Sequence, residues 1–206
     1  MTDSAITHPV PYYSQYESAV MIPDLIAGTR TAGDDPLWLK SGADSREEYA
    51  FWAPRMCGVA CLRMALDYWG HPVPPSVPLV RELCDAGAYV RDGDTVKGLI
   101  YRPFAEHTQA RWGIAAQVEP DLTTEALHRH LGGGGLALIS VHKTIRHPET
   151  TEPPSRGGHL VLAVGATEEA LLIHNPSGLP DSSQEFARVP WARLAAFYAG
   201  RGVLLG

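Results

Sequence analysis

Cys57 occupies the most chemically informative position in this chain of 206 residues. It opens an apolar stretch, residues 57–66, shortly after the helix-breaking Pro54, and this pattern predicts a helix that begins at or beside the thiol. The backbone N–H groups at such an end are free and the helix dipole is positive there, so both favour thiolate over thiol. Because the thiolate is the reactive form, Cys57 is predicted to be a nucleophile. Cys61 and Cys84 lie in apolar patterns and are interpreted as packing residues.

A cysteine nucleophile needs a base, and His159 is the candidate. It begins a β-rich run directly after the flexible residues 155–158, and Asn175 ends the next β-rich run, before Pro176. The short turn at 167–169 between the two runs predicts a hairpin, which would fold Asn175 back beside His159. Asn175 would then accept a hydrogen bond from the imidazole and fix its tautomer, as the third member of a catalytic triad does.

The order Cys, His, Asn resembles that of papain-like cysteine peptidases. Residues 57–64 (CGVACLRM) resemble the nucleophile motif of the bacteriocin-processing, double-glycine leader peptidases and their stand-alone relatives. Residues 158–165 (GHLVLAVG) are similar to the histidine motif of that family, and Asn175-Pro176 stands where the family usually has Asp-Pro. The resemblance implies an α+β, papain-like fold. In it, N-terminal helices, with the nucleophile at a helix start, pack on a C-terminal antiparallel sheet.

Residues 10–15 (VPYYSQ) are similar to the N-terminal strand of the stand-alone relatives. In the transporter-linked peptidases a glutamine shortly before the cysteine contributes to the oxyanion hole, but residues 51–56 contain none. The resemblance therefore assigns that role to Gln15. It also implies a single domain over residues 1–206, with an insertion or lid at residues 17–52.

The chemistry expected from these residues is acyl transfer through a thioester on Cys57. Attack by water would make the protein a peptidase or amidase, and this is the predicted function. Attack by an amine, alcohol or carbon nucleophile would make it an acyltransferase or cyclase, for instance in the release or modification of a natural product. A catalytically weak binding protein on the same fold is a further alternative, because Asn175 replaces the usual aspartate and Gln15 is displaced in sequence.

The elements that would position these residues are predicted as helices first and strands later, which indicates an α+β fold rather than alternating βαβ units. Ser45 to Glu48 fit a capping box, and residues 10–16 read as a strand or an extended arm, followed by an irregular segment to about residue 44. Helices are expected after Cys57, over 76–87, after 94–95, from 123 or 124 to 131, and near 190. Extended segments are expected over 112–118, 136–141, 160–164, 171–174 and 203–205.

Composition argues against several classes of function. A formal net charge of −6 without a basic run is atypical of a nucleic-acid-binding protein. No apolar stretch reaches the length of a membrane span, and the N-terminus lacks a signal-peptide pattern. Three cysteines do not suggest a disulfide framework, so a cytoplasmic location is expected, with a peptide or acyl substrate and neither nucleic acid nor membrane as partner.

No cofactor or metal is predicted. A metal hydrolase is nevertheless an alternative, since four histidines offer suitable ligands, but they show no recognised ligand spacing: His128, His130, His142 and His147. Residues 132–135 form a run of four glycines that lacks the Gly-Lys-Ser/Thr ending of a phosphate-binding loop and is interpreted as a turn.

Overall fold

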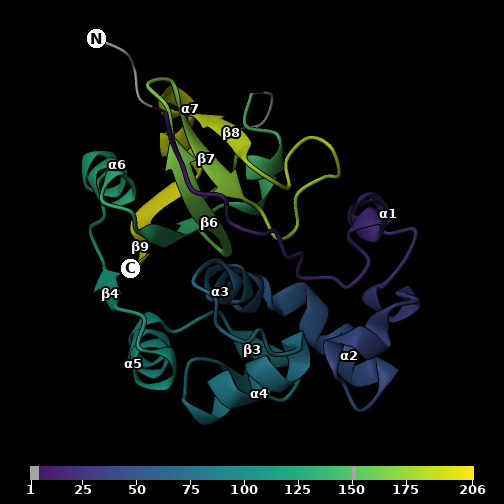
Figure 1. Cartoon of the computed structure of the whole chain (residues 1–206). Coiled ribbons are helices and arrows are strands. Elements are labelled where there is room, and N and C mark those ends of the chain that lie inside the picture. The colour runs from purple at the N-terminus through teal and green to yellow at the C-terminus, as the bar shows by residue number, and fades with distance from the viewer. Residues whose placement is uncertain (1–4, 150–151) are drawn as a thin grey trace.

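Helix α3 (Cys57–Tyr68) lies at the boundary between a mainly helical half of the molecule and a half built around the main β-sheet (Figure 1). The computed structural model describes residues 5–149 and 152–206. Helices α2, α4 and α5 lie on one side of α3, and strands β5 to β8 lie in the sheet on the other (Figure 1). The predicted α+β fold, with N-terminal helices packed on a C-terminal antiparallel sheet, is confirmed.

The α-helices and strands have the following bounds. The α-helices are α1 (Ile22–Ala27), α2 (Arg46–Trp52), α3 (Cys57–Tyr68), α4 (Ser76–Asp85), α5 (Tyr101–Trp112), α6 (Thr124–Gly132) and α7 (Trp191–Phe197). The strands are β1 (Ile6–Thr7), β2 (Val90–Asp92), β3 (Thr95–Lys97), β4 (Ala116–Glu119), β5 (Leu136–Val141), β6 (His159–Ala166), β7 (Ala170–His174), β8 (Ala187–Pro190) and β9 (Tyr198–Leu205). Short 3₁₀ helices lie at Ala19–Met21, Ala32–Asp34, Trp38–Ser41, Ala53–Arg55 and Lys143–Arg146.

The main sheet has the strand order β4-β9-β5-β6-β7-β8, and β1 pairs with the far end of β6. All of these pairings are antiparallel. The predicted hairpin is β6–β7, where Leu162 pairs with His174, so the start of β6 and the end of β7 lie at the same end of the sheet. Gly165 lacks a side chain where β1 crosses, because a Cβ there would lie 2.3 Å from the carbonyl oxygen of Ile6.

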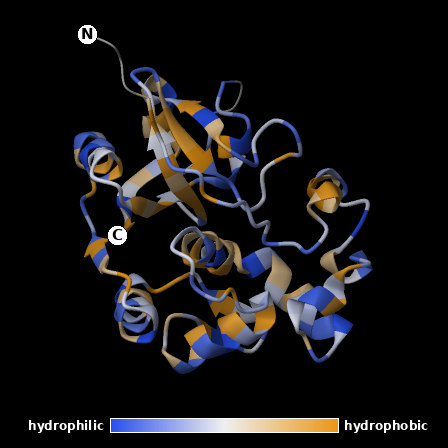
Figure 2. Ribbon diagram, in the orientation of Figure 1, coloured by the Kyte–Doolittle hydropathy of each residue, from blue (hydrophilic) through white to orange (hydrophobic). Residues whose placement is uncertain are grey.

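The sheet is buried on both faces, so β5 and β6 read as continuous apolar runs. Alternate residues of each strand point to opposite faces. One face, which includes Leu138 and Leu162, packs in the larger core with α3, α4 and α5. The other face, which includes Ile139 and Val161, packs against α6 and α7. Figure 2 shows the central strands in orange and the outer faces of the surrounding helices in blue. This two-sided packing fixes β6 firmly against α3.

Most of the elements predicted from sequence are present, with three differences. Residues 90–97 form the hairpin β2–β3, which places the predicted helix start at 94–95 in its turn and at the start of β3, and α5 begins only at Tyr101. The segment expected to be irregular to about residue 44 contains α1 and three of the 3₁₀ helices. Strands β1 and β8 were not predicted. Among the described residues, no helix is both long and apolar enough to span a lipid bilayer.

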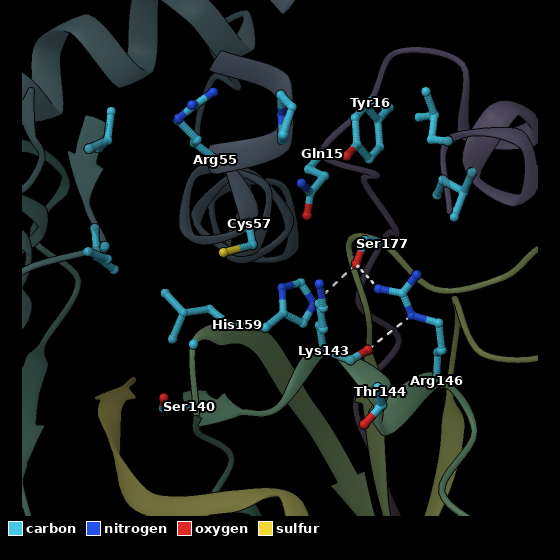
Figure 3. Close-up of a pocket in the computed structure, with 18 of the residues that line it drawn as sticks. Gln15, Tyr16, Arg55, Cys57, Ser140, Lys143, Thr144, Arg146, His159 and Ser177 are labelled. Carbon is cyan, nitrogen blue, oxygen red and sulfur yellow. Dashed lines mark hydrogen bonds between the residues drawn. The ribbon is translucent and has the colours of Figure 1, made fainter. Parts of the chain in front are cut away.

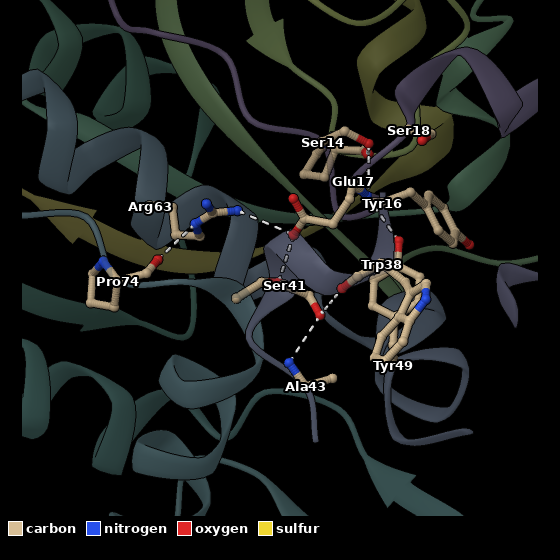
Figure 4. Close-up of polar contacts among 12 residues, drawn as sticks. Ser14, Tyr16, Glu17, Ser18, Trp38, Ser41, Ala43, Tyr49, Arg63 and Pro74 are labelled. Carbon is tan, nitrogen blue, oxygen red and sulfur yellow. Dashed lines mark hydrogen bonds and ion pairs between the residues drawn. The ribbon is translucent and has the colours of Figure 1, made fainter. Parts of the chain in front are cut away.

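The segment after Gln15 is joined to the helical half by buried polar contacts. The Glu17 carboxylate accepts a hydrogen bond from Ser76 Oγ at 2.9 Å and lies 4.0 Å from Arg63 Nη1 on α3 (Figure 4). Asp35 is buried and receives hydrogen bonds from Ser18, from the hydroxyl of Tyr49 at 2.6 Å and from the backbone of Leu37. These contacts hold the start of the 17–52 segment against α3 and α4 and tie its turns to α2.

Replacing Asp35 by asparagine is expected to lower the free energy of unfolding by about 2 kcal/mol at pH 7, since hydrogen bonds to a charged group are the stronger kind. Burial opposes ionisation of Asp35, but the hydrogen bonds from Ser18, Tyr49 and Leu37 outweigh it and lower its pKa. A lowered folded-state pKa adds stability above the unfolded pKa of about 3.9, and this is lost as the pH falls through the folded value. In urea unfolding, the free energies of unfolding of the unmodified protein and of Asp35→Asn should therefore converge at low pH. Asp44→Asn, at an exposed carboxylate, should change stability by no more than about 0.5 kcal/mol.

Candidate active site

Cys57 is the first residue of α3 and lines a cleft of about 990 Å³ between the two halves of the molecule. The chain enters the helix through the 3₁₀ turn Ala53–Arg55, so Pro54 prevents the preceding helix from continuing and α3 starts at the thiol. The next residue must be small: a Cβ on Gly58 would lie 2.8 Å from the hydroxyl of Tyr89 and 3.2 Å from Leu160 Cδ1. The glycine therefore lets the helix start approach the wall of the cleft closely.

The thiol of Cys57 is half-buried, and burial raises its pKa above the ordinary value. Backbone N–H groups of Leu160, Gly58 and Cys57 itself oppose this increase but do not cancel it. The helix start does lower the pKa of the thiol, as expected from the sequence. Burial raises this pKa by more, so the net shift is upward. In the unliganded protein Cys57 is therefore a thiol at neutral pH, and it needs a base in order to react.

His159 and Asn175 are brought together by the β6–β7 hairpin, as predicted. Asn175 Oδ1 lies 2.9 Å from His159 Nε2, and the same oxygen accepts a hydrogen bond from the backbone N–H of Ser177 at 3.1 Å. Because the Ser177 backbone N–H is always a donor, the atom that it contacts must be the amide oxygen of Asn175. His159 Nε2 must then carry the ring proton and donate a hydrogen bond to Asn175 Oδ1. The lone pair of the imidazole is therefore on Nδ1, on the side of the ring that faces Cys57 (Figure 3).

His159 is neutral at neutral pH, since burial lowers the pKa of its imidazole to about 4. The hydrogen bond with Asn175 opposes this shift, whereas the positive charges of Arg146, His142 and Lys143 add to it. The resting pair is thus a thiol beside a neutral imidazole, not a thiolate with an imidazolium. In this state Nδ1 is available to take the proton from the thiol.

Gln15 reaches the same cleft from the N-terminal arm, which is extended but forms no strand of the sheet at this point. Its backbone N–H donates to Pro176 O at 3.0 Å, so the arm is fixed beside the residue that follows Asn175. Its side-chain Nε2 donates to Ala53 O at 2.9 Å, directly before the helix start, and the buried Oε1 has no hydrogen-bond partner among the described residues. Gln15, Cys57 and His159 therefore converge, although they are distant in sequence (Figure 3).

Several residues of the cleft were not identified from the sequence. Ser177 fixes the orientation of Asn175, and the buried hydroxyl of Tyr89 beside Gly58 has no partner among the described residues. Arg146 extends from the 3₁₀ turn after β5 and contacts Ser177 Oγ at 3.4 Å. The turn residues Asn175-Pro176-Ser177 gave a signal for the first of these, while Tyr89 and Arg146 enter the cleft only through the tertiary fold.

Three of the four histidines considered as metal ligands have other side-chain contacts, and the fourth, His147, lines the cleft of Cys57. His130 bonds the carbonyl oxygens of Leu136 and Leu205, His128 packs against the ring of Trp191, and His142 bonds Thr144. Over residues 5–149 and 152–206, no three His, Cys, Asp or Glu residues are grouped closely enough to hold a metal ion. Residues 132–135 end α6 and lie outside the cleft of Cys57.

Comparison with known proteins identifies the fold. Neither a family model nor a curated protein sequence matches this chain. Among solved structures, a C39-like peptidase from Bacillus anthracis superposes with a TM-score of 0.61 at 16% identity, covering 99% of this chain and 98% of the other. The peptidase domain of Streptococcus ComA, a bifunctional ABC transporter involved in quorum sensing, superposes with a TM-score of 0.51 at 18% identity. That alignment covers 74% of this chain and 92% of the domain. At these identities the likeness establishes the fold, and it confirms at that level the resemblance seen in the sequence.

Proposed function

We propose, for a chain that has the fold of C39 peptidase domains, that it is a cysteine peptidase or amidase acting through a thioester on Cys57. One observation carries the proposal. The Ser177 backbone N–H fixes Asn175, Asn175 fixes the tautomer of His159, and the free nitrogen of that ring lies toward Cys57 in a shared cleft. A core packed only for stability has no need of this order of donors and acceptors.

Acylation would begin with the neutral pair. As Cys57 Sγ attacks the substrate carbonyl carbon, its proton passes to His159 Nδ1 and the carbonyl oxygen becomes an oxyanion. The backbone N–H of Cys57 is free at the start of the helix and can donate to that oxyanion. His159 then gives its proton to the leaving amine, the C–N bond breaks, and the acyl group remains on sulfur as a thioester.

Deacylation would use the same base. His159 Nδ1 accepts a proton from water while the water oxygen attacks the thioester carbonyl, and the C–S bond breaks to return the thiol and a carboxylic acid. An amine in place of water would form an amide and make the protein an acyltransferase. The proposal commits to hydrolysis because no feature of the described cleft selects a second nucleophile.

The test is a defined peptide library incubated with the protein and analysed by mass spectrometry. New carboxyl termini, together with a trapped adduct on Cys57 at early times, are expected. Added hydroxylamine should intercept the thioester as a hydroxamate. If products form equally in the Cys57→Ser protein, or if no peptide is cleaved and no adduct appears, the proposal is wrong.

Replacing Gln15 by alanine is expected to lower kcat by ~10²-fold, which is the typical effect of losing one oxyanion donor. The side-chain amide of Gln15 has two N–H groups, one of which donates to Ala53 O at 2.9 Å, and in this role the second would donate to the oxyanion once substrate is bound. Alkylation of Cys57 by iodoacetamide forms no oxyanion. The alkylation rate of the Gln15→Ala protein should therefore differ less than twofold from that of the unmodified protein. Equal losses in both measurements would instead indicate that Gln15 only shapes the start of the helix.

A further inference from the structure

The cleft around Cys57 is positively charged, although the chain as a whole carries a net charge of −6. Among the described residues that line it there is no Asp or Glu, but there are four basic side chains: Arg55, Lys143, Arg146 and Arg201. In a chain with 23 acidic and 17 basic residues, this separation concentrates positive charge where the substrate would bind.

These cations are also unpaired. Elsewhere in the described residues seven arginines lie within 4.0 Å of a carboxylate, but none of the four in the cleft does. Arg146 is the most informative, because it is half-buried and burial lowers the pKa of its guanidinium. Desolvating a guanidinium without a counter-charge is unfavourable, so its position indicates that a ligand supplies the missing anion.

Arg146 lies next to the proposed reaction centre. Its Nε donates to Lys143 O at 3.0 Å and its Nη2 lies 3.4 Å from Ser177 Oγ, which in turn lies 3.4 Å from His159 Nε2 (Figure 3). These contacts occupy two of the five N–H groups of the guanidinium and leave its remaining donors free for a ligand. An anion held there would sit close to the substrate group on which Cys57 acts.

Part of the cleft lining is apolar. Helix α1 contributes Ile22, Leu25 and Ile26 to the lining, and Tyr16 lies between Gln15 and this helix (Figure 3). The cleft thus presents both cations and hydrocarbon, a combination suited to a peptide with an anionic residue followed or preceded by an apolar one.

We propose that the substrate carries an oxyanion group, a carboxylate or a phosphate, within one or two residues of the scissile bond, and that Arg146 and Lys143 bind it. This inference rests on the proposed function and specifies its substrate. A guanidinium can bind a carboxylate or a phosphate in the same bidentate manner. The experiments below therefore distinguish between these two groups.

The first test compares iodoacetate with iodoacetamide, which differ in charge but hardly in size. The reference is Cys84 in the same molecule, which is half-buried and lies near both Asp85 and Arg91. The ratio of the iodoacetate rate to the iodoacetamide rate is expected to be about tenfold higher at Cys57 than at Cys84. The reason is that the cations in this partly desolvated cleft attract the anionic reagent. The double variant Arg146→Gln with Lys143→Gln should abolish this difference. Arg129→Gln, which removes an exposed arginine outside the cleft, should not. Equal ratios at the two cysteines would overturn the proposal.

The second test needs no nucleophile. Fluorescein-labelled peptides that differ at one position, glutamate, phosphoserine or glutamine, are titrated into the Cys57→Ser protein and followed by anisotropy. Binding of the glutamate or phosphoserine peptide at least tenfold tighter than the glutamine peptide supports the inference and identifies the anion. If all three bind equally or none binds, the inference fails. If Cys57 reacts with neither reagent in the first test, the proposed function is contradicted, and the anisotropy alone decides whether the cleft selects anions.

Discussion

Replacing Cys57 by serine is expected to reduce kcat/KM by ~10⁴-fold or more, on a peptide identified by the library experiment. A serine hydroxyl is far less acidic than a thiol, and the base available here is weak, since burial lowers the pKa of His159 to about 4. Such an imidazole can take a proton from a thiol much more readily than from a hydroxyl. Over residues 5–149 and 152–206, the side chains that contact the His159 ring are the neutral amide of Asn175 and the hydroxyl of Ser177, neither of which is a stronger base.

The matched control for this variant is Cys84→Ser, which changes the same atom at a half-buried position outside the cleft. Its kcat/KM is expected to stay within about twofold of the unmodified protein. Thermal unfolding of both variants checks that the loss is chemical, since Cys57→Ser removes only one polarisable atom at the helix start. A Cys57→Ser protein that retained more than a tenth of the activity would contradict the assignment of the nucleophile.

The parts of the site that could be predicted from sequence depend on local structure. The start of α3 at Cys57 follows from Pro54 and the apolar helical spacing, and the pairing of His159 with Asn175 follows from two short β-rich runs joined by a tight turn. A hairpin determines which residues become neighbours without any knowledge of the rest of the chain. The contact between these two residues was therefore accessible from the sequence alone.

The parts that could not be predicted depend on burial and on long-range packing. A helix start favours thiolate, but the sequence does not reveal how deeply the thiol lies, and burial reverses the direction of the pKa shift. The cationic wall has no sequence signature, because Arg55, Arg146 and Arg201 come from three separate segments that meet only in the folded protein. The hairpin β2–β3 did have a signal, the two-residue turn Gly93-Asp94, which the helix prediction at 94–95 overlooked.

Replacing His159 by glutamine is expected to lower kcat/KM by ~10³–10⁴-fold, the contribution of a positioned general base. The glutamine amide can still donate a hydrogen bond to Asn175, so the hairpin should keep its structure, but it cannot accept the proton of the thiol. Iodoacetamide alkylation at pH 7 should also become slower, because His159 no longer assists deprotonation of Cys57.

The pH profile gives this prediction its distinctive readout. His159 must be neutral to act as a base, and burial places its pKa at about 4, so kcat/KM should stay on its plateau down to about pH 4 and fall tenfold per pH unit below it. The His159→Gln protein should lack this acidic limb. His142→Gln, which removes a neighbouring imidazole that bonds Thr144 and does not line the cleft, should retain it. An acidic limb near the ordinary histidine value of about 6.5 would show that His159 is solvated during catalysis. The neutral-pair mechanism would then have to be replaced by an ion pair formed before the substrate binds.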